Sequence, residues 1–154
     1  MIIDELLDIG AVVPKANATS KRQALSLVAD LAAKKFGLKA STVLEALMER
    51  ESLGSTGVGH GVGVPHARLT GLDRIRGLFV KLDTPISFDA IDDEPVDLLF
   101  VLLAPPESGV DHLRALARVS RQLRRPALRE QLRNAQSSDA LLALLAHERE
   151  TTTA

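Results

Sequence analysis

The chain has 154 residues, which is typical of one domain, and its 45% hydrophobic and 25% charged residues indicate a folded globular protein. The absence of cysteine excludes disulfides, thiolate catalysis and cysteine-based metal sites. A net charge of −1 and an aromatic content of 3% argue against a nucleic-acid surface. The first ten residues carry Asp4, Glu5 and Asp8 where a signal peptide is basic, and no apolar stretch reaches about 18 residues. We therefore expect a cytoplasmic protein without membrane insertion.

Two helices are predicted in the first third of the chain. Ser20 and Gln23 have the spacing of a capping box, and Gly37 follows the last apolar position of the pattern. The apolar residues at helical spacing are Leu25, Val28, Leu31, Ala32 and Phe36. A second helix is predicted to start near Ser41 and to leave Arg50 near its C-terminal end. Its expected inward-facing residues are Leu44, Leu47 and Met48.

Residues 54–63 form a glycine-rich segment in which half of the residues are glycine, so a helix is not expected there. The segment matches neither the phosphate-binding loop of nucleotide hydrolases nor a dinucleotide fingerprint, because the required later residues are absent. Its N–H groups are able to form an anion-binding nest, or the segment is a plain flexible turn. We predict a loop and then a short strand over 62–64, ended by Pro65.

The rest of the chain alternates from strands to helices. Residues 78–82 alternate as a half-buried strand, 86–88 suit a second short strand, and 98–104 suit a strand covered on both faces. Further helices are predicted after a cap at Ser108, from Pro126, and after a cap at Ser138. The first of them holds the apolar residues Leu113, Leu116, Ala117 and Leu123. This order predicts an α/β sandwich with a mixed sheet. The expected division is one domain, 1–148, and a flexible C-terminal tail, 149–154.

Three histidines are candidates for chemistry. His66 follows the predicted strand end, and His112 lies in the first turn of a predicted helix, where the helix dipole lowers the pKa of an imidazole. His60 lies in the glycine-rich loop. Each is also consistent with an ordinary surface or partly buried histidine. Together they would supply three ligands for a catalytic zinc ion, although their spacing lacks the helical pattern of known zinc motifs.

Two charged segments stand out beside these residues. An acidic stretch contains Asp83, Asp89, Asp92, Asp93, Glu94 and Asp97. A basic stripe at helical spacing contains Arg114, Arg118, Arg121 and Arg125. Solvated faces are the simple interpretation, and contacts with a phosphate-bearing site or a charged partner are the alternative.

Several separated motifs resemble one known family. They are Arg50-Glu51-Ser52-Leu53-Gly54-Ser55-Thr56-Gly57-Val58-Gly59 with Val64-Pro65-His66, the segments 84–92 and 95–100, and His112-Leu113 with Leu116-Ala117. This combination resembles enzyme IIA of the fructose–mannitol class of the phosphoenolpyruvate-dependent phosphotransferase system. Leu53-Gly54-Ser55-Thr56-Gly57 and Phe88-Asp89-Ala90-Ile91-Asp92 are most similar to the nitrogen-regulatory form. One departure is His60, where relatives often carry Asn.

The resemblance implies a single-domain fold with a mixed β-sheet flanked by helices on both faces. It also implies that His66 is the phosphoacceptor, receiving phosphate from an HPr-like carrier protein. Arg50 is expected to stabilise the transferring oxygens, and His112 to bind the phosphate or orient His66. Neutral phosphate-binding donors are assigned to Ser55, Thr56 and Gly57. No metal or other cofactor is expected, because both donor and acceptor are histidine nitrogens.

Three functions remain open at this stage. The first is a phosphoryl-transfer component with a phosphohistidine intermediate that binds regulatory targets, such as transporters or sensor kinases, according to its phosphorylation state. The second is a sugar-specific enzyme IIA that passes phosphate to a IIB domain. The third is a histidine-rich zinc hydrolase.

Overall fold

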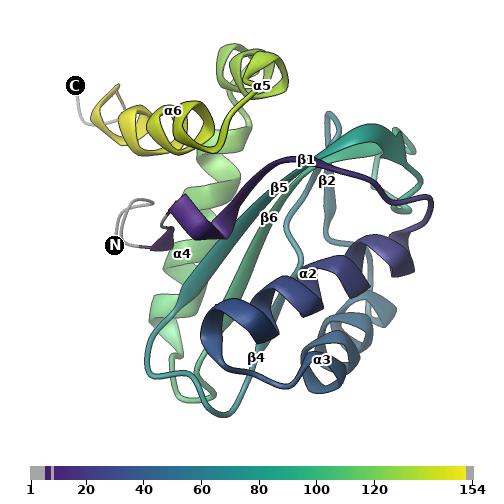
Figure 1. The fold of residues 1–154 in the computed structure, drawn as a ribbon, viewed down its shortest axis with the longest axis vertical. Helices are drawn as coiled ribbons and strands as arrows, with labels where there is room; N and C mark the ends of the chain where they lie inside the picture. The colour runs from purple at the N-terminus through teal and green to yellow at the C-terminus, as the bar shows by residue number, and fades with distance from the viewer. Residues whose placement is uncertain (1–5, 8, 152–154) are drawn as a thin grey trace.

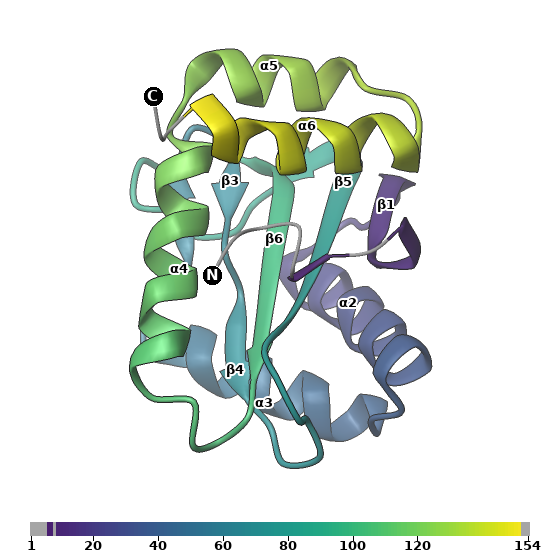
Figure 2. The ribbon, with the colours of Figure 1, turned by 90° about the vertical axis from the view of Figure 1, so that its left-hand side faces the viewer.

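The computed structural model describes residues 6–7 and 9–151, and it places one mixed sheet between two layers of helices (Figure 1). Helices α2 (Lys21–Phe36) and α3 (Ala40–Ser52) cover one face. Helices α4 (Val110–Leu123) and α6 (Ser138–Thr151) cover the other, with α5 (Pro126–Asn134) packed against both (Figure 2). The predicted α/β fold with helices on both faces is confirmed. No helix within the described residues is long and apolar enough to cross a bilayer.

The sheet has six strands, in the order β1-β5-β6-β3-β2, and β4 also pairs with β6. Strands β5 and β6 are antiparallel, whereas β1 is parallel to β5, and β3 and β4 are parallel to β6. The strands are β1 (Val12–Ala16), β2 (Gly57–Gly59), β3 (Val62–Gly63), β4 (His66–Arg68), β5 (Arg76–Ile86) and β6 (Val96–Ala104). A short 3-10 helix, η1 (Ile9–Ala11), precedes β1. Long β6 is therefore the template on which the short strands β3 and β4 are aligned.

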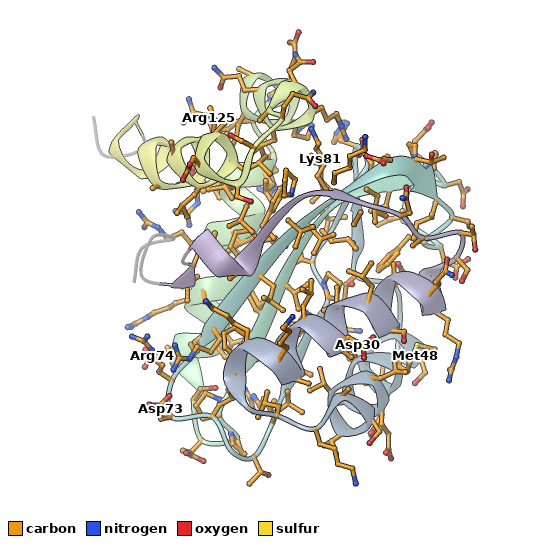
Figure 3. The ribbon with its side chains drawn as sticks, in the orientation of Figure 1. Asp30, Met48, Asp73, Arg74, Lys81 and Arg125 are labelled. Atoms are coloured by element: carbon orange, nitrogen blue, oxygen red, sulfur yellow. The ribbon has the colours of Figure 1, made fainter. Side chains whose placement is uncertain are left out.

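The core lies on both faces of the two central strands. Every residue of 98–104 is buried, which confirms the predicted strand with two covered faces. Residues 77–82 are buried as well, so β5 is not the half-buried strand that its alternation predicts. Lys81 on β5 is 8% exposed and donates to the carbonyls of Arg133 and Ala135 beside the end of α5 (Figure 3). A lysine is accepted in the core here because its charge meets the negative end of a helix.

Three strands of the structure, β1, β2 and β4, have no counterpart in the prediction. Strand β1 contains Pro14, and as an edge strand of the sheet it tolerates a residue without an N–H. Strand β2 lies in the glycine-rich segment, where a side chain at Gly57 would come within 2.8 Å of Ala90. The predicted separate strand over 86–88 is wrong, because Ile86 is the last residue of β5 and Phe88 is buried beyond it.

The predicted N-terminal capping hydrogen bond of α2, from Gln23 to Ser20, is present in the structure. The Gln23 N–H donates to the Ser20 hydroxyl at 3.1 Å, and Gly37 ends the helix with φ of 72°. The return bond differs, because the Gln23 side chain accepts from Thr19 instead of Ser20. In α3 the fully buried face is formed by Val43, Leu47 and Glu51, with Leu44 and Met48 only partly buried.

Two predicted caps of the later helices shift by one residue each. Ser108 does not cap α4, which starts after Gly109. At α6 the capping hydroxyl is that of Ser137, which accepts from the Ala140 N–H, while Ser138 donates to the Val12 carbonyl. Helix α6 continues to Thr151, so the start of the predicted tail is helical, and 152–154 lie outside the described residues.

Candidate functional site

A pocket of about 500 Å³ lies between the end of α3, strand β4 and the start of α4. It brings together three of the residues that the sequence singles out, Arg50, His66 and His112, from three separate elements. The other residues of its wall are Ala46, Glu49, Leu53, Ala67, Arg68, Leu113 and Leu116. The wall combines the cations of Arg50 and Arg68 and two imidazoles with the Glu49 carboxylate and apolar side chains.

Strand pairing explains the position of His66. Strand β3 pairs with β6 through Val62 and Leu98, the ladder is interrupted around Pro65, and β4 resumes it with His66 opposite Leu102. Proline lacks an N–H, so it suits this interruption between two collinear strands. The strand predicted over 62–64 therefore ends before Pro65, as expected. The chain then continues along β6 as strand β4 instead of leaving the sheet.

The two ring nitrogens of His66 have different partners. Nδ1 lies 2.9 Å from the Val64 carbonyl, which only accepts, so the ring proton is on Nδ1. Nε2 therefore carries the lone pair, and it accepts from Arg50 Nε at 3.2 Å. Burial is the main cause that lowers the pKa of His66 below its ordinary value, with the Arg50 charge in the same direction and the Val64 bond against it. The lowered pKa favours the neutral imidazole at pH 7, with the proton on Nδ1 and the lone pair on Nε2.

His112 lies beside His66 with its ring edge-on, at 5.6 Å between the centroids and 80° between the planes. Its Nδ1 accepts from Arg68 Nε at 3.3 Å. Burial, and then the charges of His66 and Arg68, lower the pKa of His112 to about 4. The residue is 4% exposed, and its Nε2 has no hydrogen-bond partner among the described residues. A neutral donor is therefore held next to His66.

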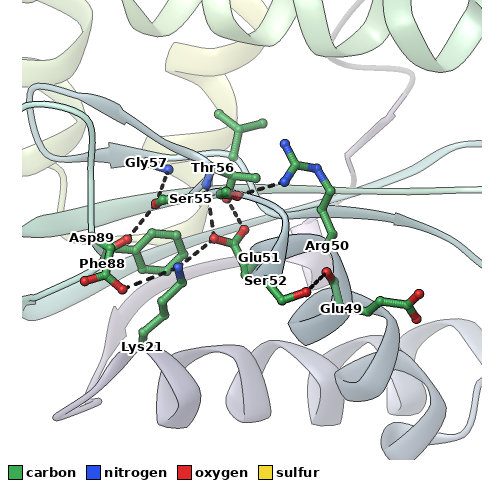
Figure 4. Close-up of polar contacts among 12 residues, drawn as sticks. Lys21, Glu49, Arg50, Glu51, Ser52, Ser55, Thr56, Gly57, Phe88 and Asp89 are labelled. Atoms are coloured by element: carbon green, nitrogen blue, oxygen red, sulfur yellow. Dashed lines mark hydrogen bonds and ion pairs between the residues drawn. The ribbon is translucent and has the colours of Figure 1, made fainter.

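A buried carboxylate supports the Arg50 side of the pocket (Figure 4). Glu51 accepts from the Thr56 N–H at 3.0 Å, from the Thr56 hydroxyl, and from Lys21 at 2.8 Å. Lys21 also lies 4.7 Å above the ring of Phe88. These bonds hold the turn after α3 closed, and the Gly54 carbonyl in that turn accepts from the Arg50 guanidinium at 2.8 Å.

The groups predicted to bind phosphate, on Ser55, Thr56 and Gly57, take part in this same network. Ser55 donates to the Phe88 carbonyl at 2.6 Å and accepts from the Gly57 N–H at 3.0 Å. The N–H and hydroxyl of Thr56 are both donated to Glu51. None of the three appears in the wall of the pocket, so their contribution to phosphate binding stays a prediction, and their bonds in this structure are internal.

The third histidine lies elsewhere. His60 is exposed at a turn with φ of 57°, its N–H donates to Asp92, and its carbonyl accepts from Arg133. No group of three potential ligands gathers anywhere in the described part of the chain. The zinc alternative therefore loses the ligand set on which it depended.

The two charged segments lie outside the pocket wall. Asp97 is paired with Arg133 at 2.9 Å, and Asp92 accepts from two main-chain N–H groups. Part of the acidic stretch therefore forms internal contacts that stabilise the fold. The basic stripe is shorter than predicted, because α4 ends before Arg125. Only Arg114, Arg118 and Arg121 share the helix.

Sequence reasoning missed three features of the site. Arg68 and Glu51 were not singled out, although Arg68 follows His66 by two residues and therefore shares its face of β4. The third feature is a set of exposed apolar residues at the pocket: Leu53 (81% exposed) and Leu113 (62%) in the wall, and Val110 (60%) nearby on α4. Leu113 belongs to the apolar set of the helix predicted after Ser108, and its exposure is seen only when α4 packs on the sheet.

Comparison with known proteins agrees with this geometry. Residues 5–148 match the family "Phosphoenolpyruvate-dependent sugar phosphotransferase system, EIIA 2". A nitrogen regulatory protein of Bradyrhizobium diazoefficiens is 44% identical over 146 residues, 95% of each chain, and a fructose-specific EIIA component of Haloferax volcanii is 42% identical over 103 residues, 67% of each. The crystal structure of nitrogen regulatory protein IIA-Ntr from Neisseria meningitidis has a TM-score of 0.88 at 34% identity, covering 93% of this chain and 98% of that one. The resemblance seen in the motifs is confirmed: the chain belongs to the EIIA type 2 family of the phosphotransferase system, with nitrogen regulatory proteins among its relatives.

Proposed function

We propose that this protein is a cytoplasmic phosphohistidine relay of a nitrogen-type phosphotransferase system, with His66 as its phosphoacceptor. The observation that carries the proposal is the orientation of His66, whose Nδ1 is bonded to the Val64 carbonyl while the neutral Nε2 faces Arg50 in the pocket. A phosphohistidine of an HPr-like carrier would supply the phosphoryl group. The bond from phosphorus to the carrier nitrogen breaks as the bond to Nε2 forms, so no further reactant is needed.

The surroundings of His66 suit this transfer. Arg50 offers a forked cation to the phosphoryl oxygens, and burial lowers the pKa of His66, which favours the neutral ring at pH 7. The exposed apolar side chains of Leu53 and Leu113 in the pocket wall, with Val110 three residues before Leu113 on α4, are suited to contact the carrier. A partner that covers them excludes water from the pocket and strengthens the interaction of Arg50 with the transferring group.

The acceptor is tested by incubating the protein with phosphoenolpyruvate, enzyme I and the HPr-like carrier. We expect one acid-labile, base-stable phosphate per chain, located on His66. The variant His66→Ala is expected to fold normally and to accept no phosphate. Its matched control is His60→Ala, which changes an exposed histidine outside the pocket and is expected to be phosphorylated like the parent. Phosphorylation of His66→Ala to the parental extent would place the acceptor elsewhere.

The regulatory part of the proposal concerns target proteins. The pocket wall carries the two positive charges of Arg50 and Arg68 and the negative charge of Glu49. Phosphorylation adds about −1.5 to −2 charges, which makes the net charge of this wall negative without requiring a new fold. Partners would then distinguish the two states by charge. The test is capture of partners from cell extract by phosphorylated and unphosphorylated protein. His66→Ala exposed to the same phosphorylation mixture is the control, and it should retain the unphosphorylated partner set. Identical partners bound equally by both forms would contradict the regulatory role.

A second function, transfer to a sugar-specific IIB domain, is favoured by the similarity to the fructose-specific component. The same phosphorylated protein distinguishes the two. Rapid loss of its phosphate to a purified IIB domain, together with loss of uptake of one sugar on deletion, would support the sugar-specific function over the regulatory one.

A further inference from the structure

The unpartnered donor of His112 is the least explained polar group in the pocket. This ring is almost fully buried, yet its Nε2 has no partner among the described residues, while its Nδ1 accepts from Arg68. A buried donor without a partner costs about 1–3 kcal/mol in a folded protein, so such groups point to a ligand or to chemistry.

We propose that Arg68 is a positioning residue for phosphoryl transfer: by donating to His112 Nδ1, it holds the His112 ring with its Nε2–H available to a phosphoryl group on His66. The inference rests on the proposed function of His66. Arg68 itself acts through His112.

The hydrogen-bonding capacity of arginine decides the tautomer. A guanidinium has donors and no acceptor, so the bond at 3.3 Å requires the lone pair of His112 to be on Nδ1. In a neutral ring the proton is then on Nε2. The low pKa of His112 keeps the ring neutral, and the adjacent Arg68 charge contributes to lowering it. Without Arg68 the ring would be free to turn or to carry its proton on the other nitrogen.

Strand β4 gives the arrangement its rigidity. His66 and Arg68 are two residues apart on one strand, so their side chains leave the same face, and both are aligned on β6 by pairing with Leu102 and Ala104. His66 and Arg68 are thus held in a fixed relation by strand β4, while His112 reaches them from α4. The described residues include no carboxylate paired with Arg68, so its contact with His112 is not a by-product of a surface ion pair.

The first test needs no phosphorylation. Protein labelled with ¹⁵N-histidine is examined by NMR in the parent and in Arg68→Met and Arg68→Lys. We expect the His112 signals of the parent to show one tautomer protonated at Nε2. Arg68→Met should populate the second tautomer measurably, and Arg68→Lys should restore the parental pattern because an ammonium also donates. Unchanged His112 signals in Arg68→Met would overturn the proposal.

The second test measures transfer from the phosphorylated carrier at saturating carrier concentration. Loss of one oriented donor in a transition state costs about 10²–10³ in rate elsewhere, and disordering this donor is expected to slow transfer about tenfold in Arg68→Met. Arg74→Met is the matched control, because it removes the same charge from an exposed residue outside the pocket (Figure 3). We expect its rate to equal that of the parent.

A double variant separates positioning from a general effect of charge. If Arg68 acts through His112, Arg68→Met should slow the parent but should not slow His112→Gln any further. Equal slowing in both backgrounds would show that Arg68 acts independently of His112 and would overturn the inference. Failure of the parent to accept phosphate at His66 would refute the proposed function instead, and the NMR test would still report on the contact between Arg68 and His112.

Discussion

The buried carboxylate of Glu51 allows a quantitative test of how the pocket is held together. The side chain is 4% exposed and accepts three hydrogen bonds, two from Thr56 and one from Lys21. In Glu51→Gln an amide oxygen in the place of Oε1 is still able to accept from the Thr56 N–H and from Lys21, but the negative charge that pairs with Lys21 is lost. A hydrogen bond to a charged group contributes about 1.5–3 kcal/mol. Because Lys21 remains 18% exposed and partly hydrated, we expect the free energy of unfolding to fall by about 2 kcal/mol.

The assay is urea unfolding of the parent, Glu51→Gln, Lys21→Met and the double variant. The double variant has the parental net charge and leaves neither buried charge unpaired, so its loss of stability should be smaller than the sum of the single losses by about 1–2 kcal/mol. The matched control is the exposed pair of Asp73 and Arg76, where Asp73 is 82% exposed. There Asp73→Asn should cost less than about 0.5 kcal/mol.

Two results would refute this reasoning. Additivity of Glu51→Gln and Lys21→Met within about 0.5 kcal/mol would mean that the two charges do not stabilise each other. A loss for Glu51→Gln as small as that of Asp73→Asn would mean that burial of the carboxylate has no energetic consequence. Either result would remove the Glu51 network as the support of the turn beside Arg50.

Three further predictions follow from the same contacts. Arg50→Lys should fold like the parent but accept phosphate on His66 about ten- to a hundredfold more slowly, because an ammonium cannot reproduce the forked contact; equal rates in quenched-flow measurements would exclude Arg50 from the site. His112 has a pKa of about 4 in the folded protein, so the unfolded chain takes up its proton first as the pH falls from 6.5, and stability decreases by about 3 kcal/mol by pH 4. Urea midpoints across this range should decrease less in His112→Gln than in the parent, and parallel curves would contradict the shift. Lys81→Met should lose about 1–3 kcal/mol, since two carbonyls beside the end of α5 lose their buried donor, while transfer to His66 is unchanged; an unaltered midpoint would argue against this role.

The sequence alone determined the elements whose signals are local. The helix that begins at Lys21 is bounded by the capping hydroxyl of Ser20 at its start and by Gly37 at its end, and both residues are adjacent to the helix in the sequence. The apolar run 98–104 predicts a strand buried on both faces, because so many adjacent large apolar residues require cover on each side. The family motifs also predict that Arg50, His66 and His112 belong to one site, and the structure brings these three side chains into one pocket.

Tertiary structure decided the features that depend on distant neighbours. The edge strand β1 carries no periodic signal of its own and exists because β5 offers it a parallel partner. The burial of Lys81 depends on carbonyls more than fifty residues away, and no local pattern reports them. In the site, the tautomer of His66 is set by the carbonyl of Val64, in the link just before β4, and the tautomer of His112 on α4 is set by the guanidinium of Arg68 on β4. The sequence therefore identifies Arg50, His66 and His112 as the residues of the site. The protonation and orientation of the two imidazoles arise from contacts that form only when β4, α3 and α4 pack together.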